Sequence, residues 1–190
     1  FYSCKKIPFN DSNIFVARTG YTGELGFEIL GNRETINNMW ETMISSNISP
    51  AGLAARDILR IEMGYCLYGH EINETINPLD AGLSWILDEK SNFIGSNQIF
   101  IEGMRKNKII FLKMLERGIP REGCEIFQDE HKIGCVTSGT FSYSLNAGVG
   151  IGYIEKSIDN YENITLKIRD KNYNLKIANR PFLTNTSLRK

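Results

Sequence analysis

Short runs of apolar residues in the first thirty positions predict a small sheet. Residues 13–18 and 25–30 are both β-like, and in the first run apolar side chains point to both faces. The connection over residues 19–24 holds two glycines, which adopt the positive φ angles of tight turns at little cost. We therefore expect residues 13–30 to form a β-hairpin.

Two helices are predicted next. Residues 34–45 and residues 52–63 both place apolar side chains at helical spacing, and Gly64 suits the end of the second helix. The apolar arc of this second helix comprises Ala54, Ala55, Ile58, Leu59 and Ile61, and its opposite arc comprises Arg56, Asp57 and Arg60. Glu62 falls within the apolar arc, where a carboxylate needs a partner.

The character of the chain changes near residue 107. Before this point, residues 65–80 predict a loop-rich crossing, residues 83–87 a strand and residues 97–105 a short helix. After it, six short β-like runs predict a small antiparallel barrel or a sandwich: residues 109–115, 124–127, 132–138, 148–154, 163–168 and 173–178. We therefore predict an α+β fold class with two domains, residues 1–106 and residues 107–190.

Composition narrows the classes of partner. The 190 residues are 42% hydrophobic, which is enough for one large domain or two small ones to bury a core. Because 22 basic residues balance 22 acidic ones, an electrostatic grip on nucleic acid or on an anionic membrane is not expected. No apolar run reaches the roughly 18 residues of a membrane span. We predict neither nucleic acid nor membrane as a partner.

Cysteine and histidine positions give no metal motif. The four cysteines form no CxxC pair, and the two histidines are not spaced as metal ligands, so we predict no metal site. Scattered free thiols suit a reducing compartment, either a bacterial cytoplasm or a mitochondrial matrix. Phe1 stands where Met is usual and runs almost directly into strand-like sequence. This start indicates a cut or processed chain.

Three side chains in the first half are candidates for ligand binding. Glu28 alternates with Phe27 and Ile29, and it is either a solvated edge residue or a recognition group. A fixed carboxylate accepts two parallel N–H bonds from a flat amidine-like edge, such as that of a pterin or a guanine. Arg56 either lies on a solvated helix face or holds an anionic or carbonyl group. Tyr21 either packs in the core or stacks on a flat ring.

The motifs resemble those of a known family. Residues 17–29 read ARTGYTGELGFEI, and residues 51–69 read AGLAARDILRIEMGYCLYG. Residues 77–83 read NPLDAGL, and GCVTSGTFS and GVGIGY follow over residues 134–142 and 148–153. In order and spacing these resemble the C-terminal half of aminomethyltransferase, the T-protein of the glycine cleavage system. The resemblance covers nearly the whole chain.

The resemblance implies both an activity and a fold. In this family a carrier, the lipoyl-bearing H-protein, presents an aminomethyl group, and the T-protein transfers the one-carbon unit to tetrahydrofolate and releases ammonia. Family members have three lobes, so residues 1–106 would be the remainder of an α/β folate-binding lobe and residues 107–190 a small antiparallel β-barrel.

The resemblance also implies roles for single residues. Glu28 falls on the family's glutamate that grips the pterin, Arg56 on a substrate-binding arginine and Tyr21 on a folate contact. The family's catalytic aspartate lies in the N-terminal half, outside this chain, so no catalytic residue is predicted here. Many members carry a ligand-contacting tyrosine near the C-terminus, whereas residues 181–188 read PFLTNTSL.

Two related classes remain as alternatives. One is the folate-binding tail of a dimethylglycine or sarcosine dehydrogenase, in which a flavin domain would precede Phe1. The other is a folate-binding protein of iron–sulfur cluster assembly. That family carries a Lys-Gly-Cys-x-x-Gly-Gln-Glu stretch, which this sequence lacks. A domain without any ligand is the structural alternative to all three.

Overall fold

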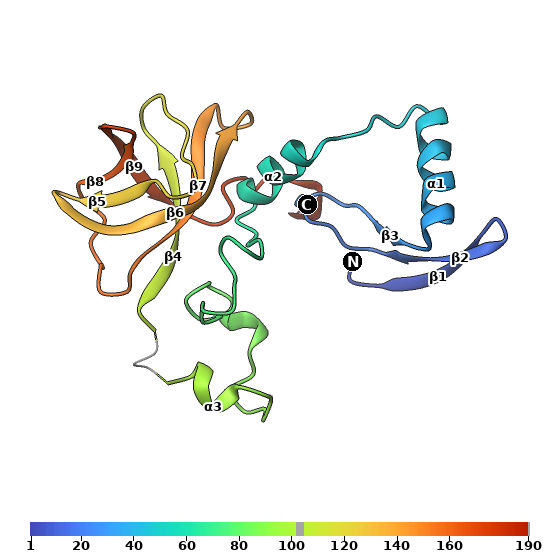
Figure 1. Cartoon of the computed structure of the whole chain (residues 1–190), viewed down its shortest axis with the longest axis horizontal. Coiled ribbons are helices and arrows are strands. Elements are labelled where there is room, and N and C mark those ends of the chain that lie inside the picture. The colour runs from blue at the N-terminus through green and yellow to red at the C-terminus, as the bar shows by residue number, and fades with distance from the viewer. Residues whose placement is uncertain (102–104, 190) are drawn as a thin grey trace. The chain divides into compact units, whose positions relative to one another are not determined.

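The computed structural model describes residues 1–101 and 105–189, which form two compact units (Figure 1). The first unit comprises Phe1–Arg60 and Leu183–Lys190, so both ends of the chain belong to it. The second unit comprises Ile61–Phe182. The predicted division into domains at residue 106 is a different partition, and it stays a prediction.

The first unit is built on a three-stranded antiparallel sheet. Strands β1 (Cys4–Phe9), β2 (Ser12–Ala17) and β3 (Glu28–Leu30) lie in that order, and β2 pairs with β3. The predicted hairpin is therefore confirmed, although its second strand is shorter than expected. The Arg18 guanidinium donates a hydrogen bond to the carbonyl of Gly26 (3.0 Å), and residues 25–27 remain in the connecting loop.

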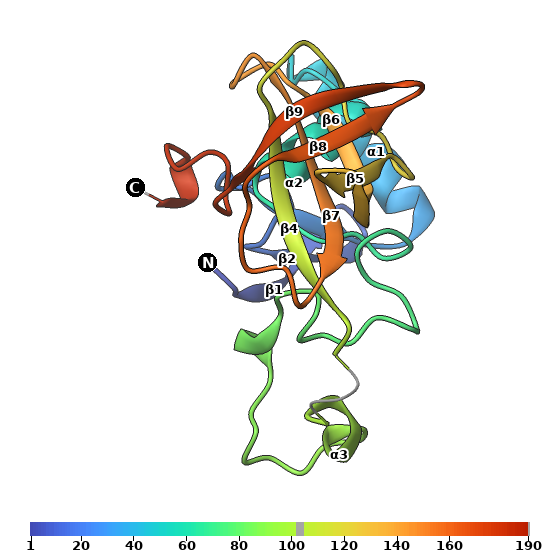
Figure 2. The same cartoon turned by 90° about the vertical axis from the view of Figure 1, so that its left-hand side faces the viewer.

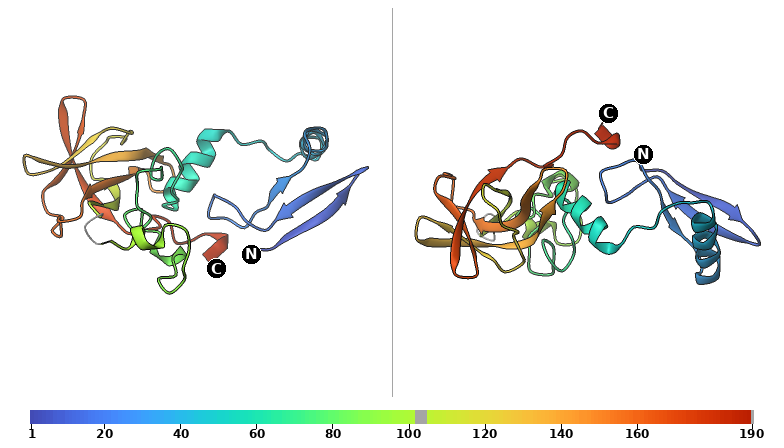
Figure 3. Two further views of the ribbon diagram at one scale, coloured as in Figure 1. Left: turned by 60° about the horizontal axis from the view of Figure 1, so that its bottom comes forward. Right: turned by 90° about the horizontal axis from the view of Figure 1, so that it is seen from above.

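Helix α1 (Arg33–Ser45) covers one face of this sheet (Figure 3). It begins at Asn32, whose side chain accepts a hydrogen bond from the backbone N–H of Thr35 at 2.8 Å, as an N-cap does. Ile14 is 4% exposed, and a Cβ added at Gly31 would lie within 3.4 Å of both Ile14 and Ile36. The helix therefore packs on the face of the sheet that carries Ile14. It confirms the helix predicted over residues 34–45.

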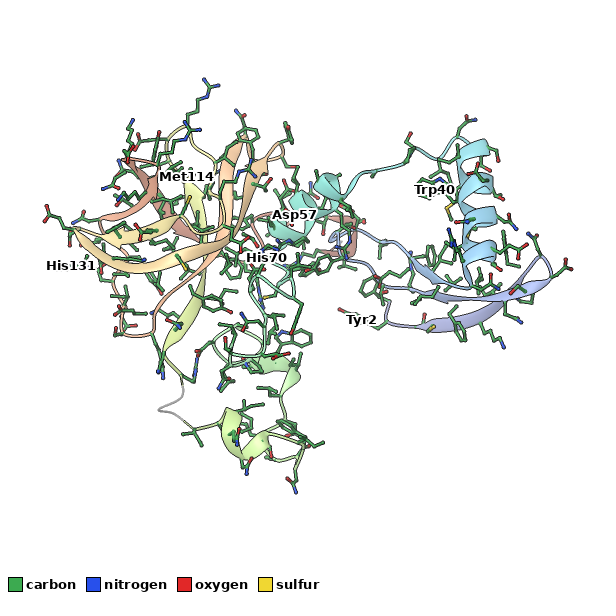
Figure 4. All side chains as sticks on the ribbon, viewed as in Figure 1. Tyr2, Trp40, Asp57, His70, Met114 and His131 are labelled. Atoms are coloured by element: carbon green, nitrogen blue, oxygen red, sulfur yellow. The ribbon has the colours of Figure 1, made fainter. Side chains whose placement is uncertain are left out.

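Helix α2 (Leu53–Glu62) confirms the second predicted helix. Figure 4 labels Asp57 on this helix, and its Oδ1 lies 2.7 Å from the Nε of Arg60. Arg60 is only 2% exposed, so the arc opposite the apolar one is partly buried. Glu62 has the partner that its position demands, since Ser142 Oγ donates to its carboxylate at 2.5 Å. The helix ends before Gly64, where φ is +68°.

The second unit contains a closed six-stranded antiparallel barrel (Figure 2). Its strands are β4 (Asn107–Met114), β5 (Glu125–Gln128), β6 (His131–Ser142), β7 (Ala147–Glu155), β8 (Ile164–Ile168) and β9 (Lys171–Ala178), in the order β4-β7-β6-β5-β8-β9. All six predicted runs are strands, and the barrel is confirmed over the sandwich. Inward-facing Ile110, Leu112, Ile126, Val136, Ile154 and Leu166 fill the core at 3% exposure or less.

One predicted strand is wrong. Residues 83–87 contain the 3₁₀ turn η1 (Ser84–Ile86), closed by the hydrogen bond from Ile86 N to Leu83 O at 3.1 Å. Trp85 is 73% exposed, so this short apolar run pairs with no sheet. Further on, α3 (Ser96–Ile99) confirms only the first turn of the helix predicted over residues 97–105, because residues 100, 101 and 105 are not helical. Positions 102–104 lie outside the described residues.

Buried polar groups attach the predicted crossing, residues 65–80, to the barrel. Glu71 is fully buried; its carboxylate accepts from Leu67 N at 3.0 Å and from Thr137 Oγ1 at 2.5 Å. The hydroxyl of Tyr153 donates to the backbone carbonyl of Glu71 at 2.8 Å. These bonds fix the crossing against β6 and β7.

Tyr153 makes the second unit sensitive to alkali. It is 7% exposed, and burial raises the pKa of its hydroxyl well above the ordinary value, with the nearby Glu71 and Asp80 adding to the shift. The pKa of Tyr153 is higher in the folded protein than in the unfolded chain. Its contribution to the stability of the fold is therefore complete below about pH 10 and is lost as the pH rises toward the folded pKa. We expect the free energy of unfolding to fall by up to about 1.4 kcal/mol per pH unit there.

Urea denaturation between about pH 9 and pH 11 measures this effect. The variant Tyr153→Phe should be less stable near neutral pH, because it lacks the bond to Glu71, yet its stability should fall less steeply above pH 10. The exposed Tyr143 provides the control variant Tyr143→Phe. An identical slope in Tyr153→Phe and the unsubstituted protein would contradict the assignment.

Candidate functional site: a loop, a strand end and a helix in the first unit

The loop between β2 and β3, residues 18–27, is held at both of its ends. At its start, the Arg18 guanidinium lies 4.4 Å from the centroid of the Phe27 ring, in addition to its bond to Gly26. Just past its end, Thr19 Oγ1 donates a hydrogen bond to Glu28 Oε2. Arg18 and Thr19 at the start of the loop are thus bonded to Gly26 and Glu28 at its end. The bond from Thr19 holds the Glu28 carboxylate at the start of β3.

Glu28 lies on the face of the sheet opposite α1. In the register of β2 and β3, Ala17 is paired with Glu28 and Phe15 with Leu30, while the alternating Ile29 belongs to the other face. Phe15 is 49% exposed and Leu30 59% exposed, so this face is open and apolar around the carboxylate. The expectation that Glu28 points away from the side of Ile29 is confirmed.

The second carboxylate oxygen of Glu28 is available to a ligand. Glu28 is solvent-exposed, and across residues 1–101 and 105–189 its Oε1 accepts no hydrogen bond. A carboxylate held through one oxygen, with the other open, can accept from a flat ring edge that presents N–H donors. A carboxylate held in this way can recognise such an edge, and the role of Glu28 as a ligand-binding residue stays a prediction.

Tyr21 and Arg56 are brought together. The guanidinium carbon of Arg56, in the first turns of α2, lies 4.6 Å from the centroid of the Tyr21 ring, which is a cation–π contact. Arg56 is exposed and Tyr21 is half-buried, so Tyr21 does not pack as a core residue. The pair presents a flat, polarizable surface with a fixed positive charge, which suits a flat ring or an anionic group.

A further contact at this loop was not predicted from the sequence. Ser187 lies in the C-terminal turn η3 (Ser187–Arg189), and its backbone N–H donates to Glu24 Oε2 at 2.8 Å. Its hydroxyl donates to the same oxygen and accepts from Leu25 N at 2.8 Å. Because Ser187 lies 162 positions after Leu25 and 163 after Glu24, no local pattern could have revealed this contact.

A cavity of about 750 Å³ lies elsewhere, in the second unit. It opens between the β4–β5 connection and the β6–β7 hairpin, and Leu115, Arg117 and Phe141 are among its lining residues. None of the three predicted ligand-binding residues lines it. Size therefore does not single out the candidate site, which rests on the chemistry and placement of its side chains.

Residues 1–101 and 105–189 contain neither a metal-binding cluster nor a membrane-spanning helix. No group of three or more His, Cys, Asp or Glu side chains there is arranged to hold a metal ion. Among the same residues, no helix combines the length and the apolar character needed to cross a membrane.

A fold of this kind, a small sheet with helices joined to a closed antiparallel barrel, defines a two-unit α+β protein with a candidate small-molecule site on its first unit. Comparison with known families identifies it further. The GCVT N-terminal domain matches residues 1–91, and the glycine cleavage T-protein C-terminal barrel domain matches residues 107–183. The chain belongs to the glycine cleavage T-protein family.

Individual relatives agree with this assignment. An aminomethyltransferase of Thermosipho melanesiensis is 39% identical over 90% of this chain and 48% of its own length, and one of Halothermothrix orenii is 37% identical over 96% and 54%. The crystal structure of glycine cleavage system aminomethyltransferase T from Bartonella henselae superposes with a TM-score of 0.82 at 33% identity, covering 93% of this chain and 51% of that one. The chain spans about half the length of the relatives that it matches.

Proposed function

We propose that this chain is part of an aminomethyltransferase of the glycine cleavage system. The complete protein would transfer the one-carbon unit from the aminomethyl-lipoyl arm of the H-protein to tetrahydrofolate, with release of ammonia. Support comes from the relatives named aminomethyltransferase, which match over nine-tenths of this chain. In the structure, the proposal rests on one observation: the Glu28 carboxylate, held by Thr19 on an open apolar sheet face.

Each of the three candidate residues has a role in the proposal. Glu28 accepts two parallel N–H bonds from the pterin edge of tetrahydrofolate, one at the open Oε1 and one at Oε2, which has a second lone pair beside its bond from Thr19. Tyr21 and Arg56 form a stacked pair that contacts the same substrate, with Arg56 available to a carbonyl or carboxylate group. Holding the folate in place supplies the positioning part of catalysis, and the folate itself carries the one-carbon chemistry.

The remaining parts of the proposal concern what lies around this chain. The H-protein and tetrahydrofolate are the partners, and neither a metal nor nucleic acid takes part. The catalytic aspartate lies outside these 190 residues, and the compartment is the bacterial cytoplasm, since the relatives above come from bacteria. Neither alternative, the dehydrogenase tail or the iron–sulfur assembly protein, is favoured by these relatives.

A turnover assay tests the proposal. The complete protein, incubated with aminomethyl-loaded H-protein and tetrahydrofolate, should form methylene-tetrahydrofolate and ammonia in equal amounts. The 190-residue chain alone should form neither, because the aspartate that would stabilise charge or control the proton is missing. Turnover by the isolated chain would refute the placement of the aspartate, and no turnover by the complete protein would refute the proposed activity.

A further inference from the structure

The C-terminal segment, residues 183–189, touches the loop that carries Tyr21. Residues 18–27 contain no helix or strand, so their order depends on side-chain and tertiary contacts. Both ends of the loop are held by Arg18 and Thr19, as described above. The middle of the loop, near Gly23 with its positive φ of 77°, is contacted instead by Ser187, which bonds to Glu24 and Leu25.

The contact at Ser187 satisfies each polar group that takes part. The Glu24 carboxylate accepts from both the backbone N–H and the hydroxyl of Ser187, and hydrogen bonds to a charged acceptor are stronger than neutral ones. The same hydroxyl accepts from Leu25 N, so it both donates and accepts. Two successive loop residues are thus bonded to one residue of the C-terminal turn.

We infer that Glu24 and Ser187 are positioning residues for the proposed folate site, acting through Tyr21. Tyr21 lies three residues before Glu24 in the same loop, and its ring is already stacked against Arg56. Fixing the middle of the loop removes backbone freedom that the ligand would otherwise have to remove on binding. The inference rests on the proposed function, because the ligand it concerns is tetrahydrofolate.

Binding measurements on the complete protein test this coupling. Glu24→Ala should weaken tetrahydrofolate binding by about fivefold in isothermal titration calorimetry, since it removes two hydrogen bonds from a partly exposed contact. Glu24→Gln, which keeps an acceptor oxygen, should recover most of the loss. In a Tyr21→Ala background, Glu24→Ala should cost less than about twofold, because the residue through which it acts is gone.

The neighbouring Thr186 supplies a matched control. Thr186 is 5% exposed, and in the part of the chain that the structure describes its hydroxyl has no hydrogen-bond partner. The variant Thr186→Val keeps the shape of the same turn while removing no bond to the loop. It should leave the affinity for tetrahydrofolate unchanged, whereas Ser187→Ala should weaken it by about threefold.

Amide hydrogen exchange separates the inference from the proposed function. Residues 20–25 should exchange several times faster in Glu24→Ala and in Ser187→Ala than in Thr186→Val or the unsubstituted protein. Equal exchange in all four would overturn the inference whatever the binding data show. Unchanged affinity in Glu24→Ala, or an equal loss with and without Tyr21, would also overturn it. Failure of the unsubstituted protein to bind tetrahydrofolate would overturn the proposed function and the ligand-positioning role, while the exchange rates would still decide the loop contact.

Discussion

Glu28→Gln should weaken the binding of tetrahydrofolate to the complete protein by about 10- to 100-fold. The substitution keeps the size of the side chain but replaces one carboxylate oxygen with an NH₂ group, which would face an N–H donor of the pterin. Charge-assisted pairs with two parallel bonds are worth about 1.5–3 kcal/mol, which corresponds to this loss. Calorimetric titration with tetrahydrofolate measures it directly.

The variant Glu41→Gln is the matched control for this experiment. Glu41 is an exposed glutamate on α1, so its substitution removes the same charge from the same unit away from the open sheet face. Its affinity for tetrahydrofolate should stay within about twofold of the original, because exposed charges are screened. If Glu28→Gln bound as tightly as Glu41→Gln, then Glu28 would not be the pterin ligand.

The second large effect is expected in the barrel, where Gly134→Ala should destabilise the second unit by about 3 kcal/mol or more. A Cβ at this position of β6 would lie 1.9 Å from the carbonyl oxygen of Tyr153 and 2.8 Å from Ile154 Cα. Both atoms belong to the backbone of the paired strand β7, so neither can rotate away. Urea denaturation followed by circular dichroism measures the loss as a lower midpoint.

A second glycine of the barrel calibrates this prediction. At Gly150 in β7, an added Cβ would meet its nearest atom, the Ser138 carbonyl oxygen, at 3.0 Å. Because this approach needs a shift of only a few tenths of an ångström, Gly150→Ala should cost about 1 kcal/mol. Equal losses of stability in the two variants would contradict the prediction, because they would show that the close approach of β6 and β7 at Gly134 costs no more than the wider one at Gly150.

Those parts of the fold that depend on local pattern could be predicted from the sequence. Helical spacing of apolar residues located α1 and α2, and the turn residues between β-like runs located the barrel strands. Because Glu62 lies on the apolar arc of its helix, the sequence predicted that its carboxylate has a partner. Nothing in the sequence identified that partner as Ser142. Residues 83–87 were wrongly predicted as a strand, because a short apolar run has the same pattern whether or not another strand pairs with it.

The candidate site could be predicted only in part, for a similar reason. Alternation along β3 correctly placed Glu28 opposite Ile29, since the side-chain period of a strand is two. The pairing of Tyr21 with Arg56 joins a loop to a helix more than thirty residues later, and spacing alone does not encode it. The bonds of Thr19 and Ser187 depend on the path of the loop, which the positive φ of Gly23 permits but does not determine.

The membership of residues 183–190 in the first unit has a consequence for how the protein is made on the ribosome. Phe1–Arg60 precedes the barrel in the chain, so the turn that bonds to Glu24 is synthesised only after the entire barrel has been translated. A nascent chain can therefore form the three-stranded sheet while the loop over residues 18–27 still lacks its contact with Ser187. A stop codon at any position from 183 to 187 would leave every barrel strand intact and yet remove Ser187, so the loop would lack this contact.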